Sequence, residues 1–201
     1  MGNIRTPQQK RSEATRQRII AAAENLFSQK GYYHTNSKEI AKAAGVSIGS
    51  FYSYFTDKKA LFIENLTQYS LKIFSKVLAP HQGQLFAGKD KQAVVNQLIF
   101  RAIEAHEYSP EFHRQTSAMR YMDADVAKVR QKEEQMILHY VIQSLRSYDG
   151  NLRVTDVEAA AVIVVSAVES VVHMIKIDKP EIEEHRLITQ LSEMITRYLF
   201  D

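Results

Sequence analysis

Hydrophobic positions recur at spacings of three and four residues along almost the whole chain, which predicts helices. Residues 13–30, for example, place Ile19, Ala23, Leu26 and Phe27 on one face, and a glycine then ends the pattern. The alternation that marks a half-buried strand is absent from the sequence. The pattern therefore predicts an all-α fold of nine helices, at residues 13–30, 36–44, 47–54, 57–78, 90–107, 110–120, 123–148, 155–177 and 181–200.

Two of these helices are short and adjacent, and their ends carry strong local signals. Asn36 followed by Glu39 has the spacing of a capping box, and Ser47 can cap the helix after the turn. Gly45 lies between the two helices, where a tight turn needs it. Two short helices joined in this way predict a helix-turn-helix motif.

The turn also spells Gly-x-Ser-x-Gly at residues 45–49, the pattern of the nucleophile elbow in serine hydrolases. That elbow requires a strand before the serine and a helix after it. Ser47 instead lies between two predicted helices, so we expect no catalytic residues. His106, Glu107 and His113 match no standard metal-ligand spacing, and no metal or cofactor is expected. An enzyme that uses a cavity in the C-terminal part stays open as an alternative.

The charge is distributed unevenly. Residues 1–59 contain ten Lys and Arg against four acids, a balance of 10 − 4 = +6, whereas the remaining residues carry 16 − 19 = −3. A basic N-terminal segment favours a polyanionic partner, although a solvated surface gives the same count.

The second helix of a helix-turn-helix enters the major groove of DNA with its N-terminal end first. In residues 47–54 we expect Phe51 to face the core, as Phe55 does just after it, and Ile48, Gly49, Tyr52 and Ser53 to point elsewhere. For Tyr54, core packing is the alternative to a phosphate contact. Ile48 can contact a thymine methyl group, and Gly49 permits a close backbone approach. The predicted DNA-binding residues are Arg16, Thr35, Asn36, Ser47, Ile48, Gly49, Ser50, Tyr52, Ser53, Tyr54 and Lys58.

The run TRQRIIAAAENLFSQKGYYHTNSKEIAKAAGVSIGSFYSYFTDKKALF resembles the DNA-binding domain of TetR-family transcriptional regulators. The matching elements are an Arg-x-x-Ile helix ending Leu-Phe, the run IAKAAGVS, the helix GSFYSYF and the pattern F-x-x-K-x-x-L-F. Asn36, Ser37 and Ile48 depart from the usual residues, which affects the base pairs that are read. The resemblance implies a DNA-binding domain at residues 1–56 and a ligand-binding and dimerisation domain at 57–201, with 57–78 as the connecting helix.

Two C-terminal helices carry the expected dimer contact. Residues 159–168, AAAVIVVSAV, are small and apolar nearly all round, and such a helix must be covered on two sides. The resemblance implies a homodimer through residues 155–177 and 181–200, while burial inside one chain is the alternative. The same apolar window contains Glu158, Glu169 and His173, so it favours a buried helix over a membrane span. We expect a cytoplasmic protein without a membrane partner.

A small-molecule effector is expected where polar groups interrupt apolar helices. Ser166, Glu169 and His173 share one helix face, and methionines adapt to apolar ligands of varied shape. The candidate ligand-binding residues are Phe100, Ile103, Met119, Met122, Met136, His139, Tyr140, Ser166, Glu169 and His173. Ordinary core packing is the alternative for each of them.

Together these features predict a sequence-specific DNA-binding regulator. The simplest form is a dimeric repressor that a small molecule releases from a pseudo-palindromic operator of double-stranded DNA. An apolar stripe along residues 57–78 (Phe62, Leu66, Tyr69, Ile73 and Val77) permits that helix to couple the two sites. The alternatives are a hydrolase with a C-terminal cavity and a DNA-binding protein without an effector.

Overall fold

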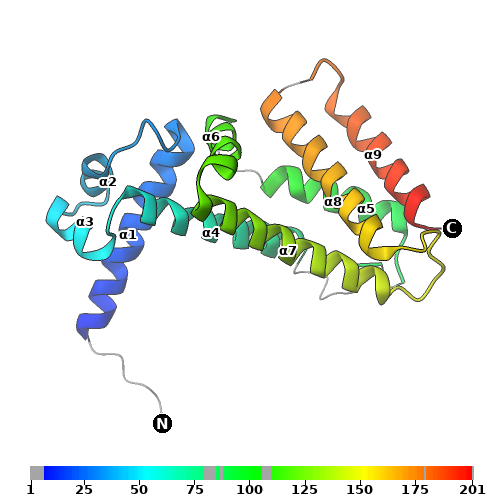
Figure 1. The fold of residues 1–201 in the computed structure, drawn as a ribbon, viewed down its shortest axis with the longest axis horizontal. Helices are drawn as coiled ribbons and strands as arrows, with labels where there is room; N and C mark the ends of the chain where they lie inside the picture. The colour runs from blue at the N-terminus through cyan, green and yellow to red at the C-terminus, as the bar shows by residue number, and fades with distance from the viewer. Residues whose placement is uncertain (1–6, 79–84, 87, 106–109, 179, 201) are drawn as a thin grey trace, which may run out of the picture. The chain divides into compact units, whose positions relative to one another are not determined.

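The computed structural model describes residues 7–78, 85–86, 88–105, 110–178 and 180–200. These residues form nine α-helices and no extended strand, apart from an isolated bridge between Leu152 and Phe200 (Figure 1). The helices are α1 Pro7–Lys30, α2 Ser37–Ala43, α3 Ile48–Tyr54, α4 Lys58–Val77, α5 Lys91–Ala105, α6 Pro110–Met122, α7 Ala124–Arg146, α8 Val157–His173 and α9 Glu184–Leu199. The predicted all-α fold and its nine helices are confirmed.

The helix ends differ from the predictions by three residues or more in three places. Helix α1 begins at Pro7 rather than at residue 13, because its first turns are polar and carry no apolar stripe to read. Helix α8 ends at His173 and continues as a π-helical segment, η2, over Met174–Asp178. Helix α9 begins at Glu184 rather than at residue 181. Periodicity locates helices well and their ends less well, because end residues make few core contacts.

The short helices are held by the caps that the sequence predicts. The side-chain oxygen of Asn36 accepts the Glu39 N–H at 3.0 Å, and the Glu39 carboxylate accepts the Asn36 N–H at 3.2 Å. Ser47 Oγ accepts the Ser50 N–H at 3.0 Å. Gly45 has a φ of 66°, a left-handed conformation that glycine adopts without steric cost. The helix-turn-helix geometry is therefore fixed largely by local hydrogen bonds.

The chain forms two compact units. The first consists of residues 1–68 and 108–129, as far as they are described, and contains α1–α3, the first half of α4, α6 and the start of α7. Its core is aromatic. The ring centroid of Phe62 lies 5.3 Å from the ring centroid of Phe27 and 5.8 Å from that of Phe112. Helix α6 thus packs into the same core as the helix-turn-helix. The proposed functional boundary at residue 57 stays a prediction.

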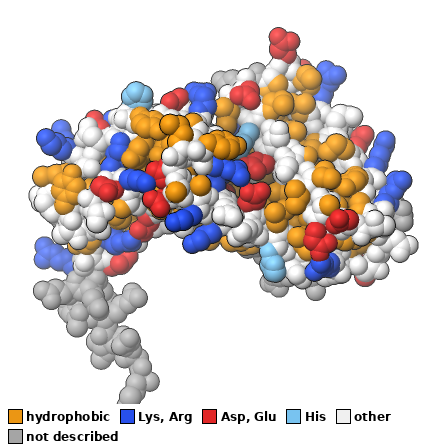
Figure 2. All heavy atoms as spheres, in the orientation of Figure 1, with side chains coloured by type: hydrophobic (Ala, Val, Ile, Leu, Met, Phe, Trp, Pro, Cys, Tyr) orange, Lys and Arg blue, Asp and Glu red, His pale blue; other side chains and the backbone are white. Residues whose placement is uncertain are grey.

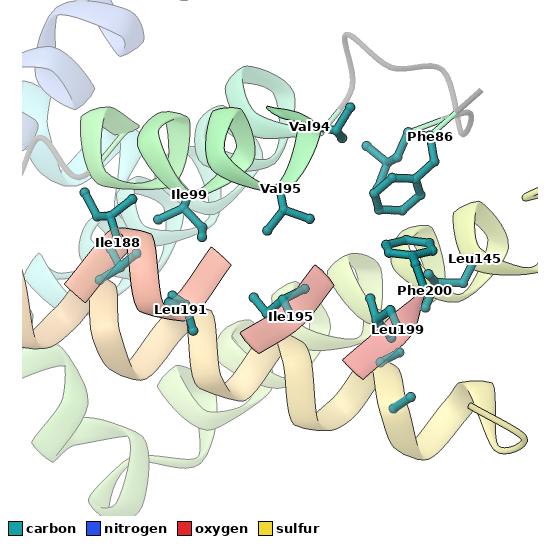
Figure 3. Packing of buried hydrophobic residues seen from close by; sticks show 14 of the residues in the cluster. Phe86, Val94, Val95, Ile99, Leu145, Ile188, Leu191, Ile195, Leu199 and Phe200 are labelled. Atoms are coloured by element: carbon teal, nitrogen blue, oxygen red, sulfur yellow. The ribbon is translucent and has the colours of Figure 1, made fainter. Parts of the chain in front are cut away.

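The second unit consists of residues 69–107 and 130–201, again as far as they are described. Its core lies mainly between α5, α8 and α9, and Figure 3 shows Val95 and Ile99 of α5 above Leu191 and Ile195 of α9. At one end of this core the rings of Phe86 and Phe200 lie 4.7 Å apart. This packing buries one face of α9 completely and leaves part of α8 exposed.

Helix α8 with η2, Val157–Asp178, is long and apolar enough to cross a membrane by length and composition, with a mean hydropathy of 1.9. Core helices of soluble proteins meet the same test. Two of its acids form ion pairs with α7, Glu158 with Arg146 and Glu169 with Arg130. Such pairs are typical of a helix that packs in a protein rather than in lipid.

Candidate nucleic-acid interface

Helix α3 is attached to the first unit by two phenylalanines. Phe51 and Phe55 are both buried, their ring centroids 6.1 Å apart, as the sequence predicts. Next to this anchored side, α3 presents Ile48 and Tyr52 to solvent, and the Tyr52 side chain is 54% exposed. One face of α3 is therefore anchored and the other is available to a partner.

Gly49 lies on this available face, in the first turn of α3. A Cβ atom at Gly49 would meet only Ser47 Oγ, at the ordinary contact distance of 3.9 Å. Glycine in a helix costs about 1 kcal/mol relative to alanine, and nothing within the described residues requires that cost here. The close approach of a molecule from outside, such as a DNA backbone, is a physical reason for glycine at this position.

The polar residues around α3 fall into two groups. The Asn36 and Ser47 side chains accept backbone N–H groups as helix caps, so their contribution is to orient the two helix N-termini. Ser53 and Ser50 lie on the surface side, where Ser53 Oγ donates to the Ser50 carbonyl at 2.7 Å. Helix N-termini and hydroxyl groups are common phosphate ligands.

Tyr54 and Arg16 connect α3 and its end to neighbouring helices. Ser12 Oγ of α1 donates to the Tyr54 hydroxyl at 3.3 Å. Arg16 of α1 forms an ion pair with Glu64 of α4, and its guanidinium lies 5.3 Å from the centre of the Phe55 ring. Both side chains hold the end of α3 in place, in addition to any contact with DNA.

The structure places Thr35 and Lys58 differently from the prediction. Thr35 is only 2% exposed, and its hydroxyl donates to the Gly31 carbonyl at 2.8 Å. Lys58 Nζ donates to the carbonyls of Tyr32 and Thr35, both at 2.8 Å, and burial lowers the pKa of Lys58. The prediction had both residues facing DNA. In the structure they fasten the link between α1 and α2, where the Lys58 ammonium group donates to two backbone carbonyls.

Basic side chains surround the helix-turn-helix. Arg11 and Arg18 of α1 and Lys38 and Lys42 of α2 are exposed, and Figure 2 shows blue side chains in the region where Figure 1 draws α2 and α3. These charges attract a polyanion irrespective of its sequence.

Sequence reasoning missed the contribution of α6 and α7 to this unit. Gln115 of α6 accepts the Tyr33 N–H at 3.2 Å. Lys59, in the first turn of α4, forms ion pairs with Asp123 at 2.7 Å and Asp125 at 2.9 Å. These partners lie more than 60 residues apart in sequence, and no local pattern marks them.

The predicted ligand-binding residues do not form one set. Met119 and Met122 lie in the first unit, on α6, whereas the other eight lie in the second unit. Met122 is 83% exposed, and Phe100, His139 and Ser166 are also exposed, so their place in a ligand cavity stays a prediction. Ile103 is buried, Met136 is half-buried, and the half-buried Tyr140 donates its hydroxyl to the Leu78 carbonyl at 2.7 Å.

Glu169 and His173 belong to a larger polar cluster between α7 and α8. Arg130 donates to Glu133 at 2.6 Å and to Glu169 at 3.0 Å. Burial raises the pKa of Glu133, against the opposing effect of Arg130, and burial also lowers the pKa of His173. Arg130 and Glu133 are further residues that sequence reasoning missed. No group of three or more possible metal ligands occurs within the described residues. His106 and Glu107 lie outside the described residues.

A helix-turn-helix whose second helix is anchored on one side, with basic side chains around it, is typical of a DNA-binding protein. Residues 19–64 match the family model of bacterial regulatory proteins of the tetR family, and residues 92–199 match that of the tetracyclin repressor-like C-terminal domain. The second match alone covers more than half of the chain. The chain therefore belongs to the TetR family of transcriptional regulators.

Individual relatives are similar mainly in the N-terminal part. The chain is 47% identical over 60 residues to the uncharacterized HTH-type transcriptional regulator YuxN of Bacillus subtilis, covering 30% of this chain and 21% of that protein. It is 36% identical over 94 residues to the regulator AcrR of Shigella flexneri, covering 47% of this chain and 42% of that protein. The matches thus span less than half the length of these relatives.

Solved structures share the whole fold. A putative TetR-family regulator from Mesorhizobium loti has a TM-score of 0.80 at 19% identity, covering 95% of this chain and 99% of that one. A TetR-family regulator from Streptomyces coelicolor has a TM-score of 0.71 at 24% identity, covering 91% and 79%. At these identities the likeness establishes the fold.

Proposed function

We propose that this protein is a cytoplasmic transcriptional repressor that binds a pseudo-palindromic operator as a homodimer and leaves it when a small molecule binds. The observation that carries the proposal is the exposed face of α3. It combines Ile48 and Tyr52 on the surface with Gly49, whose missing side chain serves no packing need inside the described unit. Family membership supports DNA binding, and base-edge contacts by such a face give it sequence preference.

The dimer is supported by apolar side chains that the single chain leaves uncovered. Val162 and Ile163 of α8 are 47% and 53% exposed. On α9, Ile188, Leu191 and Ile195 face the core, while Met194 and Tyr198 face solvent. Exposed apolar residues close together on a helix, here on each of two helices, are typical of a protein–protein contact. A two-fold dimer has two recognition helices and reads two half-sites.

The effector is supported by the polar cluster of Arg130, Glu133, Glu169 and His173 in the second unit. Buried ionisable groups are costly unless they pair or bind a ligand, and perturbed pKa values cluster at functional sites. Helix α4 is continuous from Lys58 in the first unit to Val77 in the second. A continuous helix is a physical route by which ligand binding in one unit can displace the other.

The first experiment is selection of DNA duplexes from a random library by the purified protein. We expect a preferred sequence with two inverted half-sites whose centres lie about 34–36 Å apart, or a multiple of that distance. A thermal-shift screen then identifies molecules that raise the melting temperature, and each is tested for release of the selected duplex. Absence of any preferred sequence rejects sequence-specific DNA binding. Ligands that bind the protein without releasing the duplex favour a regulator that is not a ligand-released repressor.

A further inference from the structure

Gln115 of α6 is a buried polar side chain that contacts the link between α1 and α2. It is only 8% exposed. Its Oε1 accepts the backbone N–H of Tyr33 at 3.2 Å, and its Nε2 donates to Glu111 on the preceding turn of α6 at 2.6 Å. Tyr33 lies in the link between α1 and α2, 82 residues earlier in the chain. A side chain with both ends of its amide bonded has a fixed orientation.

The link is shaped to receive this side chain. Gly31 has a φ of 78°, and a Cβ atom there would lie 2.5 Å from Gln115 Oε1. Only glycine therefore allows the Gln115 amide to lie this close to the backbone of the link. The contact is a close fit of two specific residues rather than general packing.

The rest of the link is held from inside the same unit. Thr35 donates to the Gly31 carbonyl, and Lys58 donates to the carbonyls of Tyr32 and Thr35. The next residue, Asn36, is the N-cap of α2. The position of this link therefore sets where α2 begins, and α2 carries α3 through the tight turn at Gly45.

The α6 side of the contact is held within the same unit. Phe112, one turn before Gln115, lies against Phe62 of α4 with ring centroids 5.8 Å apart. Just beyond α6, Asp123 accepts backbone N–H groups at the start of α7 and forms an ion pair with Lys59 of α4. Because α6 is fixed at both ends within the unit, Gln115 presents its oxygen to Tyr33 from a defined place.

We propose that Gln115 is a positioning residue for DNA recognition, which acts through the α1–α2 link to hold the helix-turn-helix in the geometry that reads base edges. Gln115 itself contacts no DNA in this proposal, which rests on the proposed DNA-binding function. Its loss leaves the basic surface intact and leaves the Tyr33 N–H without its acceptor. Phosphate contacts tolerate small shifts of the unit, whereas base readout does not.

The test compares Gln115→Met with Arg114→Met in the full-length protein. Methionine keeps the length of the Gln115 side chain and removes its oxygen. Arg114 is the matched control, because it bonds the same Glu111 carboxylate at 3.1 Å but faces solvent. Fluorescence anisotropy measures binding to the duplex selected by the unaltered protein and to a scrambled duplex at the same salt concentration.

For Gln115→Met we expect about a tenfold loss of affinity for the selected duplex and less than about a twofold change for the scrambled one. Arg114→Met leaves both affinities unchanged. Equal losses on the two duplexes, or no loss on either, overturn the proposal, because a simply structural residue changes the fraction of folded protein and not the ratio of the two affinities.

Two further measurements keep the result decisive. If Gln115→Met does not fold, the double variant Glu111→Gln with Gln115→Glu replaces it. This exchange keeps an oxygen for the Tyr33 N–H and keeps the bond between an amide and a carboxylate. It should show the same ratio of affinities for the two duplexes as the unaltered protein, and a lower ratio overturns the proposal.

Amide hydrogen exchange at Tyr33 needs no DNA. Faster exchange in Gln115→Met than in Arg114→Met supports the contact even if no duplex is preferred, and equal exchange overturns it.

Discussion

Gly49 is subject to two opposing demands. Helix stability favours a side chain at this position, since glycine has the larger conformational freedom to lose on folding. Recognition favours no side chain if another molecule's surface lies against it. The open space around Gly49 means that the two demands can be separated by a single substitution.

Gly49→Ala should therefore stabilise the protein while weakening its binding to the operator. We expect a gain of up to about 1 kcal/mol in the free energy of unfolding, measured by chemical denaturation, together with reduced affinity in a DNA-binding titration. Gly45→Ala is the contrasting variant, because Gly45 has a φ of 66° and alanine there is strained. A Gly49→Ala protein that binds the operator as tightly as the unaltered one would show that DNA does not approach this residue closely.

The variant Lys58→Met tests whether Lys58 stabilises the fold by donating to backbone carbonyls or binds a DNA phosphate. Because Lys58 satisfies two carbonyls of the α1–α2 link, we expect a loss of about 1–3 kcal/mol in the free energy of unfolding. The dependence of operator affinity on salt concentration should keep its slope. A slope that falls by about one unit would instead show that Lys58 releases a counterion from DNA.

The Lys59–Asp123 pair gives the protein a defined response to acid. The hydrogen bond from Lys59 is the main cause that lowers the pKa of Asp123 below its ordinary value of 3.8. An acid with a depressed pKa contributes stability above its unfolded value and loses it as the pH falls through the folded value. Lys59→Met should therefore lower the melting temperature at pH 7 and have a smaller effect at acid pH, while NMR titration shows the pKa of Asp123 returning upward. An unchanged pKa of Asp123 in the variant would contradict the pairing.

Local residues were predictable and distant partners were not. The Asn36–Glu39 capping box, the Ser47 cap and the buried Phe51 all follow from spacings of three or four residues, and the structure contains each of them. Thr35 and Lys58 are predicted to face DNA, and no local spacing indicates another partner for either of them. Their actual partners are carbonyls up to 26 residues away, exposed by the left-handed turn at Gly31.

At the scale of the element, α8 has two apolar faces with different surroundings. Ala160, Ala161 and Val172 are buried in the core of the second unit, and Val164 and Val168 pack against that core. Val162 and Ile163 point away from it. The sequence showed that the helix needs cover on two sides, but only the packing shows which residues face which side.

Substitutions on the two faces should have different results. Ile163→Arg should leave the chain folded and shift it from dimer to monomer in light scattering at micromolar concentration, with loss of operator binding. Val168→Arg should lower the melting temperature instead, because it places a charge against the core. A dimeric Ile163→Arg protein would show that this face of α8 is not the dimer contact.

Element boundaries show the same limit of sequence reasoning. The nine helices follow from the 3.6-residue periodicity of their apolar positions, but the polar first turns of α1 and the π-helical segment after His173 have no such signature. The predicted effector residues have the weakest signal in the sequence. Apolar side chains such as Met119 and Met122 look alike in sequence whether they line a cavity, fill a core or face solvent.

At the scale of the whole molecule, the proposed release mechanism requires reciprocal coupling. An effector that weakens operator binding a hundredfold must itself bind a hundredfold more weakly to the operator complex, a coupling of about 2.7 kcal/mol. Calorimetric titration of a molecule from the thermal-shift screen, with and without the selected duplex, measures both affinities. Equal ligand affinity in the two titrations would reject release, even if DNA binding and dimerisation were established.

The inclusion of α6 in the first unit bears on how such regulators can be recombined. A chimera that joins residues 1–56 of this protein to the body of a relative would separate the α1–α2 link from Gln115 and the aromatic core from Phe112. The donor helix-turn-helix would then rest on a foreign helix that offers other side chains at both places. A graft intended to transfer operator preference should therefore carry residues 110–129 along with the N-terminal segment, although they lie more than 40 residues further along the chain.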